Sequence, residues 1–288
     1  MIITPWVHAA RPITLVASII PIISAMLILP SATFKINIFS WTLIAAIIIQ
    51  IVTNYINDLF DFLKGADKNR IGPSRMLQSG LILESQMRKA ITVLICIGII
   101  SGIPLVIQGG ISIIIIGLSS FLFAYLYTGG PYPLAYNGLG DIFVFIYFGI
   151  IAVLGSYFLQ TGFVDTSSIY LAISIGAKNV LLLIINNIRD FKTDRKTNKK
   201  TLIVLFGLYF GKLQTLCMLI LSYLSIYMLA LNFEKLNIFY LTLVSLPLSL
   251  SILYDTLYKH DTFLNKTLAK ISTLLILDCI LLSIGIYT

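Results

Sequence analysis

Residues 90–140 contain no Asp, Glu, Lys or Arg, and this charge-free stretch limits the possible folds more than any other feature of the sequence. About 20 apolar residues in a helix cross the hydrocarbon core of a bilayer, so the stretch is long enough for two spans. The whole chain has the same character, because 58% of its 288 residues are hydrophobic and 11% are charged. Soluble domains carry about 25% charged residues. The sequence therefore predicts an all-α, polytopic transmembrane protein, and we expect residues 1–288 to form one transmembrane domain.

Apolar runs separated by Gly, Pro and charged residues predict a bundle of nine transmembrane helices. The expected ranges are 12–30, 41–60, 91–107, 111–128, 139–160, 168–188, 212–231, 237–256 and 267–287. The first range is interpreted as a membrane helix and not as a signal peptide, because so many further spans follow it.

Positive charge is distributed unevenly between the two sides of this bundle. Sixteen of the 20 Lys and Arg residues lie in the N-terminal segment, in the connections after even-numbered helices, or at the start of the last helix. The opposite connections hold only Lys35 and Lys235. Cytoplasmic loops carry such an excess, so we expect the N-terminus inside, the C-terminus outside, and a bacterial cytoplasmic membrane. Topology and anionic lipid headgroups explain the net charge of +8 without a nucleic-acid partner.

Two clusters of acidic residues and asparagines lie at the ends of the second and sixth expected helices. Asn54, Asp58 and Asp61 are spaced i, i+4, i+7, and the spacing places them on one helical face. Residues 186–201 repeat the pattern, with Asn186, Asp190 and Asp194 at i, i+4, i+8. Both clusters fall on the side of the membrane that we expect to be cytoplasmic.

The composition of the clusters favours a magnesium–diphosphate site. Carboxylate and amide oxygens are ligands for a hard divalent cation, and Mg²⁺ takes its other ligands from the oxygens of a phosphorylated substrate. Neighbouring cations would neutralise the rest of a diphosphate; these are Arg70, Arg75, Arg189, Arg195 and Lys200. The alternative is that both are charged loops at the membrane edge, but two matching clusters on one side make a shared site the better interpretation.

Four stretches of the sequence carry a resemblance to a known family: residues 9–25, 57–82, 127–162 and 186–202. They resemble the UbiA superfamily of intramembrane prenyltransferases, and within it the branch that prenylates 1,4-dihydroxy-2-naphthoate. The resemblance implies a nine-helix bundle whose two aspartate-rich motifs hold a polyprenyl diphosphate through Mg²⁺. It covers the chain from residue 9 to about residue 202.

The resemblance also assigns roles to individual positions of this chain. It implies metal ligands at Asp58, Asp61, Asp67, Asp190 and Asp194. It implies substrate contacts at Asn57, Arg70, Arg75, Asn187, Arg189 and Lys200, and Asn54 joins these candidates because it shares the helical face of the first cluster. The chain departs from the branch at Leu205, where a basic residue is usual.

Lys178 is an unusual charge inside the sixth expected span. It precedes Arg189 by eleven positions, close to three helical turns, so we expect it to face the same cavity. Charges inside a membrane usually face a bundle interior and mark function, which favours a substrate contact. An ion pair with Asp278 in the last span is an equally weighted alternative.

Residues 127–141 form a Gly-rich connection with Tyr127, Tyr132 and Tyr136, ending at Asp141. Tyrosine rings can stabilise a carbocation, and Asp141 could act as a base or orient a phenolic acceptor. An interfacial aromatic belt would explain the same residues. The resemblance favours the site for some of them, namely Tyr127, Tyr132 and Asp141.

Together these features predict a Mg²⁺-dependent membrane prenyltransferase. The expected reaction transfers a polyprenyl group from an allylic diphosphate to 1,4-dihydroxy-2-naphthoate with decarboxylation. Asp58, Asp61, Asp190, Asp194 and Asp141 are the expected catalytic residues. Alternatives are another acceptor (4-hydroxybenzoate, homogentisate, haem or a glycerol phosphate) and a cation-coupled transporter. The oligomeric state and the prenyl chain length stay open.

Overall fold

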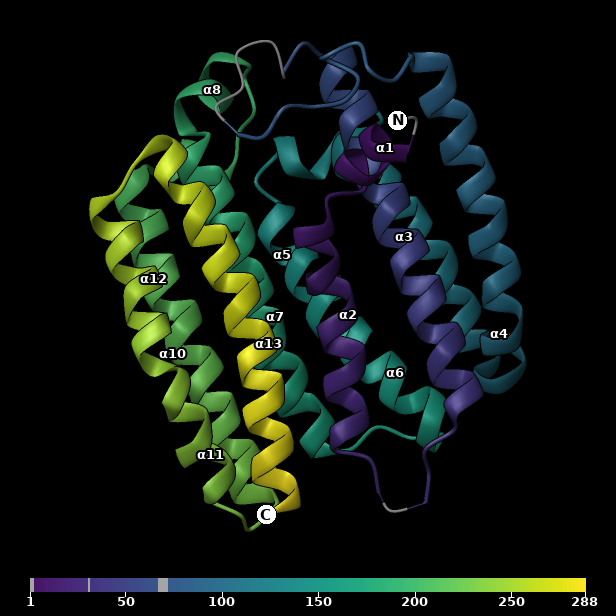
Figure 1. Ribbon diagram of the computed structural model, residues 1–288, viewed down its shortest axis with the longest axis vertical. Helices are drawn as coiled ribbons and strands as arrows, with labels where there is room; N and C mark the ends of the chain where they lie inside the picture. The colour runs from purple at the N-terminus through teal and green to yellow at the C-terminus, as the bar shows by residue number, and fades with distance from the viewer. Residues whose placement is uncertain (1–2, 31, 67–71) are drawn as a thin grey trace.

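The computed structural model is a bundle of long helices, and it describes residues 3–30, 32–66 and 72–288 (Figure 1). Asp67 and Arg70 lie outside the described residues. In chain order the helices are α1 (Ile3–Ala10), α2 (Pro12–Leu27), α3 (Ile36–Leu63), α4 (Glu84–Thr128), η1 (Leu134–Tyr136), α5 (Gly140–Phe145), η2 (Ile146–Ile151), α6 (Ala152–Thr161), α7 (Thr166–Arg189), α8 (Phe191–Lys196), α9 (Leu202–Phe206), α10 (Leu208–Asn232), α11 (Asn237–Thr242), η3 (Leu243–Ser245), α12 (Leu246–Tyr258), η4 (Asp261–Phe263) and α13 (Leu264–Tyr287).

Each of the nine predicted ranges overlaps a helix of the structure. Within the described part of the chain, seven helical segments are long and apolar enough to cross a membrane, or up to eight when the bent pair of α1 and α2 is one span. One of the seven is α4, which is two helices joined at Gly110. Gly110 has φ 64° and ψ −147°, a conformation open to glycine but not to an L side chain, so the chain turns there as predicted.

The central helix of the bundle is α7, which packs against α2, α10, α13 and the α5–η2–α6 segment. Asp165 fixes its start, because the Asp165 carboxylate accepts from the Ser168 amide at 2.8 Å and the Ser168 hydroxyl accepts from the Asp165 amide at 3.3 Å. Residues 140–161 pack against α7, and a π-helical turn, η2, lies in the middle of this segment. A Cβ at Gly149 in that turn would lie 2.4 Å from the Cα of Gly176, so only glycine permits this close approach.

The helices form two groups around α2 and α7. In Figure 1, α10, α12 and α13 lie on one side, α3 and α4 on the other, and α2, α5, α6 and α7 between them. The largest core cluster joins α2, α6, α7, α10, α12 and α13, whereas α3 and α4 pack mainly on each other.

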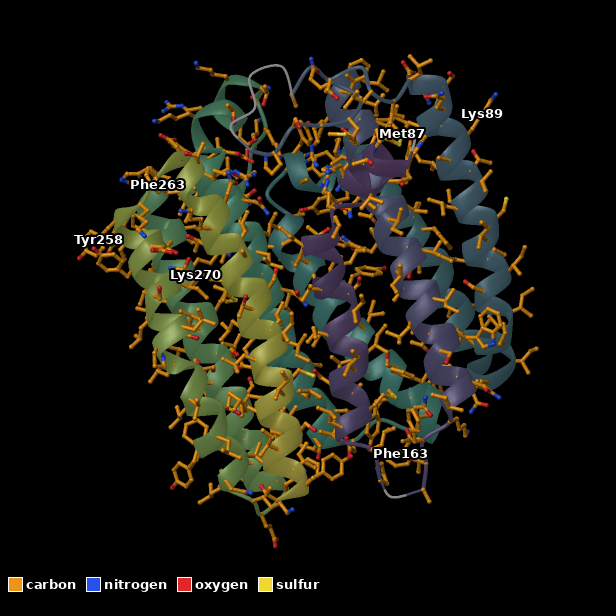
Figure 2. All side chains as sticks on the ribbon, viewed as in Figure 1. Met87, Lys89, Phe163, Tyr258, Phe263 and Lys270 are labelled. Carbon is orange, nitrogen blue, oxygen red and sulfur yellow. The ribbon has the colours of Figure 1, made fainter. Side chains whose placement is uncertain are left out.

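The two ends of the bundle carry different parts of the chain. The connection after α3, the short helix α8 and the N-terminus lie at one end, and the C-terminus lies at the other (Figure 1). Lys89 at the start of α4 marks the first end, and Phe163 after α6 marks the second (Figure 2). Both aspartate-rich motifs therefore belong to one end of the bundle.

Candidate active site

The first motif lies on the last three turns of α3. Asn54, Asn57, Asp58 and Asp61 are all buried. The Asn54 side-chain amide donates to the Ala10 carbonyl at 2.8 Å, and Asn57 Oδ1 accepts from the Thr128 hydroxyl at 2.9 Å. Since α1 and the end of α4 hold these two asparagines, the motif is fixed before any ligand arrives.

The second motif is divided between two helices. The predicted face of Asn186, Asp190 and Asp194 on one helix is wrong, because α7 ends at Arg189 and α8 begins at Phe191. Asp190 lies at the junction, where its carbonyl accepts from the Asp194 amide at 2.8 Å. The chain turn therefore sets how Asp190 and Asp194 lie relative to each other.

Arg189 is a buried partner of Asp190. Its guanidinium donates to both carboxylate oxygens of Asp190, with Nε–Oδ1 at 2.8 Å and Nη2–Oδ2 at 2.6 Å. Its Nη1 donates to Asn265 Oδ1 of α13 at 2.8 Å. In the described structure Arg189 orients Asp190 and joins the motif to α13.

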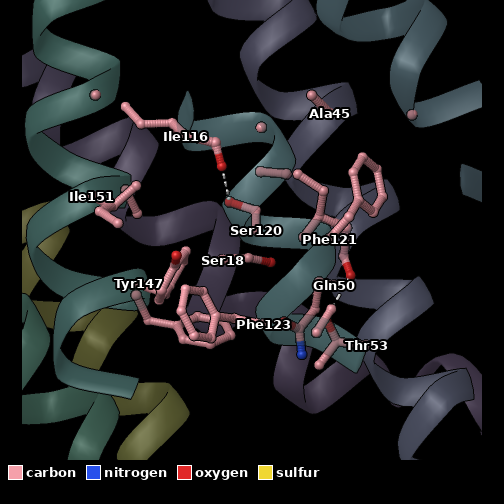
Figure 3. A pocket seen from close by; sticks show the side chains of 18 of the residues that line it. Ser18, Ala45, Gln50, Thr53, Ile116, Ser120, Phe121, Phe123, Tyr147 and Ile151 are labelled. Carbon is pink, nitrogen blue, oxygen red and sulfur yellow. Dashed lines mark hydrogen bonds between the residues drawn. The ribbon is translucent and has the colours of Figure 1, made fainter. Parts of the chain in front are cut away.

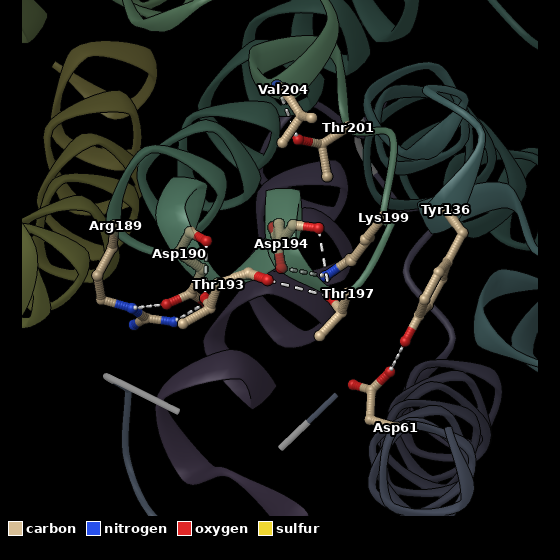
Figure 4. Close-up of polar contacts among 10 residues, drawn as sticks. All are labelled: Asp61, Tyr136, Arg189, Asp190, Thr193, Asp194, Thr197, Lys199, Thr201 and Val204. Atoms are coloured by element: carbon tan, nitrogen blue, oxygen red, sulfur yellow. Dashed lines mark hydrogen bonds and ion pairs between the residues drawn. The ribbon is translucent and has the colours of Figure 1, made fainter. Parts of the chain in front are cut away.

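Tyr136 of η1 connects the two motifs (Figure 4). Its hydroxyl donates to Asp61 Oδ1 at 2.8 Å, and its carbonyl accepts from the Lys200 amide at 3.0 Å. The ammonium groups of Lys64 and Lys199 lie 4.3 and 5.6 Å from the centre of its ring. Such cation–π contacts hold positive charge beside the acids.

The surroundings of Asp194 destabilise the charged form of its carboxylate. Burial raises the pKa of Asp194 to about 6, and the negative charges of Asp190 and Asp61 add to this rise. Lys199 opposes the rise in that pKa, with its Nζ 3.5 Å from Asp194 Oδ1. Asp194 Oδ2 is buried and has no hydrogen-bond partner among the described residues. Such a carboxylate is suited to bind a cation, which would stabilise its charged form.

Burial also affects Lys64, a cation beside the site. Burial lowers the pKa of Lys64, the carboxylate of Asp61 opposes this, and the positive charge of Lys199 lowers the pKa further. The ammonium of Lys64 donates to the Thr128 carbonyl at 2.5 Å. An anion placed between Lys64 and Lys199 would relieve their mutual repulsion.

The donors fit a hard divalent metal that shares its coordination with a substrate. In the part of the chain that the structure describes, no three acidic, His or Cys side chains form a ready-made metal cluster. The carboxylates come from α3 on one side and from the α7–α8 junction on the other (Figure 4). Mg²⁺ needs only one or two of them when phosphate oxygens supply further ligands, so the arrangement fits the metal.

A cavity of about 560 Å³ begins beside the motifs and extends between α2, α3, α4, α5–α6 and α7 (Figure 3). Asn54, Asn57, Asn186 and Tyr127 line it at the motif end, and most of its other walls are apolar. Its volume is within the range of about 300–1,000 Å³ usual for small-molecule sites. The chain therefore combines a polar anion-binding end with an apolar chamber.

The predicted acceptor residues are only partly brought together. Tyr127 lines the cavity, and its hydroxyl would lie 3.3 Å from a Cβ at Gly140. The buried Asp141 accepts from Gln214 Nε2 of α10 at 3.3 Å. It directly follows Gly140, which lies against Tyr127. Tyr132 does not join them, because it is 60% exposed and lies outside the lining of the cavity.

Lys178, a further predicted substrate contact, lies away from the large cavity. Its ammonium pairs with Asp278 of α13 in a separate small cavity. The ion-pair alternative is therefore the one that the structure supports. The Lys200 side chain is exposed, and its backbone amide makes the contact to Tyr136. Arg75 is half-buried on the connection after α3, and Asn187 is buried on α7.

Sequence reasoning missed Lys64, Lys199, Gln214 and Asn265, and gave Tyr136 no role of its own. Lys64 and Lys199 were counted only as topology signals, although each lies within five residues of a motif aspartate. Gln214 and Asn265 lie near the starts of late helices, far in sequence from both motifs. Nothing in their local sequence links them to the motifs.

Comparison with known proteins places the chain among prenyltransferases. Residues 18–274 match the model of the UbiA prenyltransferase family. The chain is 31% identical to the 1,4-dihydroxy-2-naphthoate octaprenyltransferase of Haemophilus influenzae over 98% of this chain and 95% of that protein. It is 33% identical to the protein of the same name from Mycobacterium leprae, over 70% of this chain and 69% of that protein.

Solved structures agree at the level of the fold. The apo structure of a UbiA homologue from Aeropyrum pernix superposes with a TM-score of 0.72 at 14% identity, covering 95% of this chain and 96% of that one. A UbiA homologue from Archaeoglobus fulgidus, bound to GPP and Mg²⁺, gives a TM-score of 0.63 at 14% identity, covering 97% and 99%.

Proposed function

The chain belongs to the UbiA prenyltransferase family, and from this we propose that it transfers a polyprenyl group to 1,4-dihydroxy-2-naphthoate. The donor would be an allylic polyprenyl diphosphate, and the product, after loss of the carboxylate as CO₂, a demethylmenaquinol. The observation that carries the proposal is the meeting of two carboxylate motifs through Tyr136 at the mouth of an apolar cavity. The names of the bacterial relatives support the choice of acceptor.

Asp58, Asp61, Asp190 and Asp194 would hold Mg²⁺, with Asp67 as a further candidate outside the described residues. Mg²⁺ supplies, when bound, compensation for the charge that develops on the departing diphosphate. Asp194 fits this role because its buried Oδ2 has no hydrogen-bond partner among the described residues. Tyr136 would fix the rotamer of Asp61 through its hydroxyl.

Lys64 and Lys199 would attract the diphosphate to the space beside Tyr136, with Arg70, Arg75 and Lys200 as contacts from the surrounding connections. In this proposal Arg189 positions Asp190 instead of binding substrate directly, because Asp190 and Asn265 already occupy its guanidinium. Asn54, Asn57 and Asn187 would complete the polar wall around the diphosphate. The arrangement places the leaving group at the polar end of the site.

The isoprenoid C1 would then lie where the polar end meets the apolar chamber. Breaking the C1–O bond leaves the electron pair on the diphosphate and an allylic cation in the cavity. The apolar walls would keep water from this cation, and the ring of Tyr127 offers it a negative π-face. Asp141, held by Gln214 and close to Tyr127, would orient the hydroxyl groups of the naphthoate.

The proposed topology puts this end of the bundle on the cytoplasmic side, in accord with the positive charges of its connections. Both water-soluble reactants, the naphthoate and the diphosphate headgroup, would then enter from the cytoplasm. The isoprenoid tail would remain at the depth of the bilayer.

The test is a reaction of the purified protein in detergent or liposomes with 1,4-dihydroxy-2-naphthoate, a polyprenyl diphosphate and Mg²⁺, followed by product mass. We expect a product whose mass equals acceptor plus prenyl group minus CO₂. Parallel reactions with 4-hydroxybenzoate and homogentisate test the acceptor. Turnover of one of these and not of the naphthoate would refute the proposed acceptor while keeping the prenyl transfer.

A further inference from the structure

Gln50 of α3 places an unused hydrogen-bond acceptor on the wall of the large cavity. The side chain lines the cavity and is 6% exposed. Its Nε2 lies 3.4 Å from the Thr14 hydroxyl of α2 and 3.5 Å from Asn54 Oδ1. Thr14 gives its hydroxyl proton to the Arg11 carbonyl, so both neighbours can only accept from Gln50. The amide nitrogen therefore faces them, and Oε1 is left without a hydrogen-bond partner among the described residues.

Other polar side chains of the lining differ from Gln50 in this respect. The hydroxyl groups of Ser18, Thr53 and Ser120 each donate to a carbonyl of their own helix, at 2.7–3.0 Å. Asn179 Oδ1 also lacks a partner among the described residues, but this atom is fully buried. An isoprenoid lying against Gln50 would leave its Oε1 unpaired, which costs free energy. The position therefore suits a ligand that carries a hydrogen-bond donor.

Three aromatic rings, which we call the aromatic cluster, form another wall of the same cavity. Phe143 of α5 and Tyr147 of η2 are stacked, with ring centroids 6.4 Å apart and an interplanar angle of 12°. Phe123 of α4 lies 4.6 Å from Phe143 and 5.4 Å from Tyr147 between ring centroids. All three line the cavity, and in Figure 3 Tyr147 and Gln50 come from opposite sides of it. Such a cluster offers both faces and edges to an aromatic ligand.

Gln50 and the aromatic cluster lie at a similar depth below the motifs. The Thr128 hydroxyl donates to Asn57 Oδ1 at 2.9 Å, which aligns the end of α4 with α3. Phe123 precedes Thr128 by five residues and Gln50 precedes Asn57 by seven. At 1.5 Å per residue they lie about 7.5 and 10.5 Å below this contact, and Gln50 is about 12 Å along α3 from Asp58. The two walls thus flank one layer of the cavity, below the space proposed for the diphosphate.

We propose that Gln50 determines specificity for the acceptor: its Oε1 accepts a hydrogen bond from one ring hydroxyl of the dihydroxynaphthoate, while the aromatic cluster contacts the fused rings. This inference rests on the proposed function, since it concerns the acceptor of that reaction. A ring hydroxyl supplies the proton that Oε1 lacks. The quinone form has carbonyl oxygens in place of the hydroxyls, so it would bring a second acceptor against Oε1. Gln50 therefore favours the reduced form of the ring over the oxidised form.

Two analogues that each lack one hydroxyl, 1-hydroxy-2-naphthoate and 4-hydroxy-2-naphthoate, test the contact without turnover. Their dissociation constants are measured by calorimetry in detergent with Mg²⁺ and pyrophosphate, for the unmodified protein and for Gln50→Met, which keeps the side-chain length but removes the amide. We expect Gln50→Met to weaken the analogue that keeps the contacted hydroxyl about tenfold (~1.4 kcal/mol), and the other by no more than about twofold. Equal losses with both analogues, or no loss with either, would overturn the inference.

Steady-state kinetics supply a second readout, with melting curves to show that each variant is folded. Gln50→Met should raise KM for 1,4-dihydroxy-2-naphthoate about tenfold and leave KM for the polyprenyl diphosphate within about twofold. Thr42→Val is the matched control, because Thr42 lines the cavity two turns further along α3 and its hydroxyl donates to the Ile38 carbonyl at 2.7 Å. This control should match the unmodified protein with both substrates. Equal rises in both KM values in Gln50→Met would overturn the inference.

Phe143→Leu tests the aromatic cluster. We expect it to weaken binding of naphthalene-1,4-diol about fivefold and of benzene-1,4-diol by no more than about twofold, because the smaller ring has less surface to bury. Phe239→Leu is the control, since Phe239 pairs with Tyr227 and lies outside the cavity lining. Equal losses for the two diols in Phe143→Leu would overturn the contact with the fused rings.

The outcomes separate the ring contact from the proposed reaction. Selective loss of one hydroxynaphthoate in Gln50→Met, in a protein that transfers no prenyl group to the naphthoate, would refute the proposed function and retain the ring contact. Prenyl transfer to the naphthoate with the same KM in Gln50→Met would keep the proposed function and overturn the inference.

Discussion

The ion pair of Lys178 and Asp278 gives the sharpest test of how this bundle is held together. The ammonium lies 2.5 Å from Asp278 Oδ2, and the two side chains are 3% and 7% exposed. Lys178 also donates to the Ser174 hydroxyl at 3.2 Å, whereas Asp278 has no polar partner other than this ammonium among the described residues. The pair joins α7 to α13 inside the membrane-spanning part of the bundle.

The expected loss follows from this burial. Lys178→Met leaves the Asp278 carboxylate buried without its cation, and breaking a buried pair from one side costs about 3–5 kcal/mol. Replacing both charges, in Lys178→Met with Asp278→Leu, removes the unpaired charge as well and is expected to be neutral or stabilising by about 1–4 kcal/mol. At roughly 2 °C per kcal/mol for a chain of this size, the single variant should melt at least about 6 °C below the unmodified protein.

Circular-dichroism melting curves in one detergent at matched concentration measure this difference. Prenyl transfer at a temperature below both transitions supplies the second readout, and the double variant should keep it within about twofold because the pair lies outside the large cavity. A single variant that melts within 2 °C of the unmodified protein would refute the energetic argument. Loss of prenyl transfer in a double variant that stays folded would instead support Lys178 as a substrate contact.

Three perturbations address the motif end of the cavity. Asp61→Asn and Asp194→Asn keep the side-chain shape but remove a charge that is proposed to bind the metal, and each should lower turnover by at least about a hundredfold (~2.7 kcal/mol) in a protein that still melts normally; near-normal product formation would refute the proposed metal role. Tyr136→Phe deletes a hydrogen bond to a carboxylate, a contact of about 1.5–3 kcal/mol, and should raise the Mg²⁺ concentration needed for half-maximal turnover about tenfold or more; an unchanged Mg²⁺ dependence would contradict its positioning role. Chelation with EDTA should stop pyrophosphate release and added Mg²⁺ should restore it, whereas release that continues in EDTA would contradict a metal-dependent ionisation.

The helices were predictable because each span is long, apolar and ended by glycine, proline or charge. The charge-free residues 90–140 fixed two spans, and the structure bends the chain at the predicted Gly110. The π-turn over residues 146–151 was not predictable, because it depends on the contact between Gly149 and Gly176, which are 27 positions apart.

The site was predictable to the extent that its residues share a helical face. Asn54, Asp58 and Asp61 are buried together on α3, as their spacing requires. The second motif broke the rule, since a chain turn at Asp190 ends the helix before Asp194.

Residues that reach the site from elsewhere in the chain followed no local pattern. Asn265 meets Arg189 across 76 positions, and Gln214 meets Asp141 across 73. Helical spacing alone misplaced Lys178. This residue lies three turns before Arg189, but its side chain faces Asp278 of α13, and the large cavity lies on another side of α7.

Tyr136 has a consequence for how this protein can change in evolution or by engineering. Its hydroxyl contacts α3, its carbonyl contacts the chain after α8, and its ring lies beside the cations of both segments. A residue inserted or deleted between Gly129 and Tyr136 would displace all of these contacts in one step, since the length of that connection sets where the ring arrives. The connection should therefore tolerate changes of residue type at exposed positions such as Tyr132 but not changes of length, and chimaeras with related enzymes should exchange this connection together with the segment that contains Lys199.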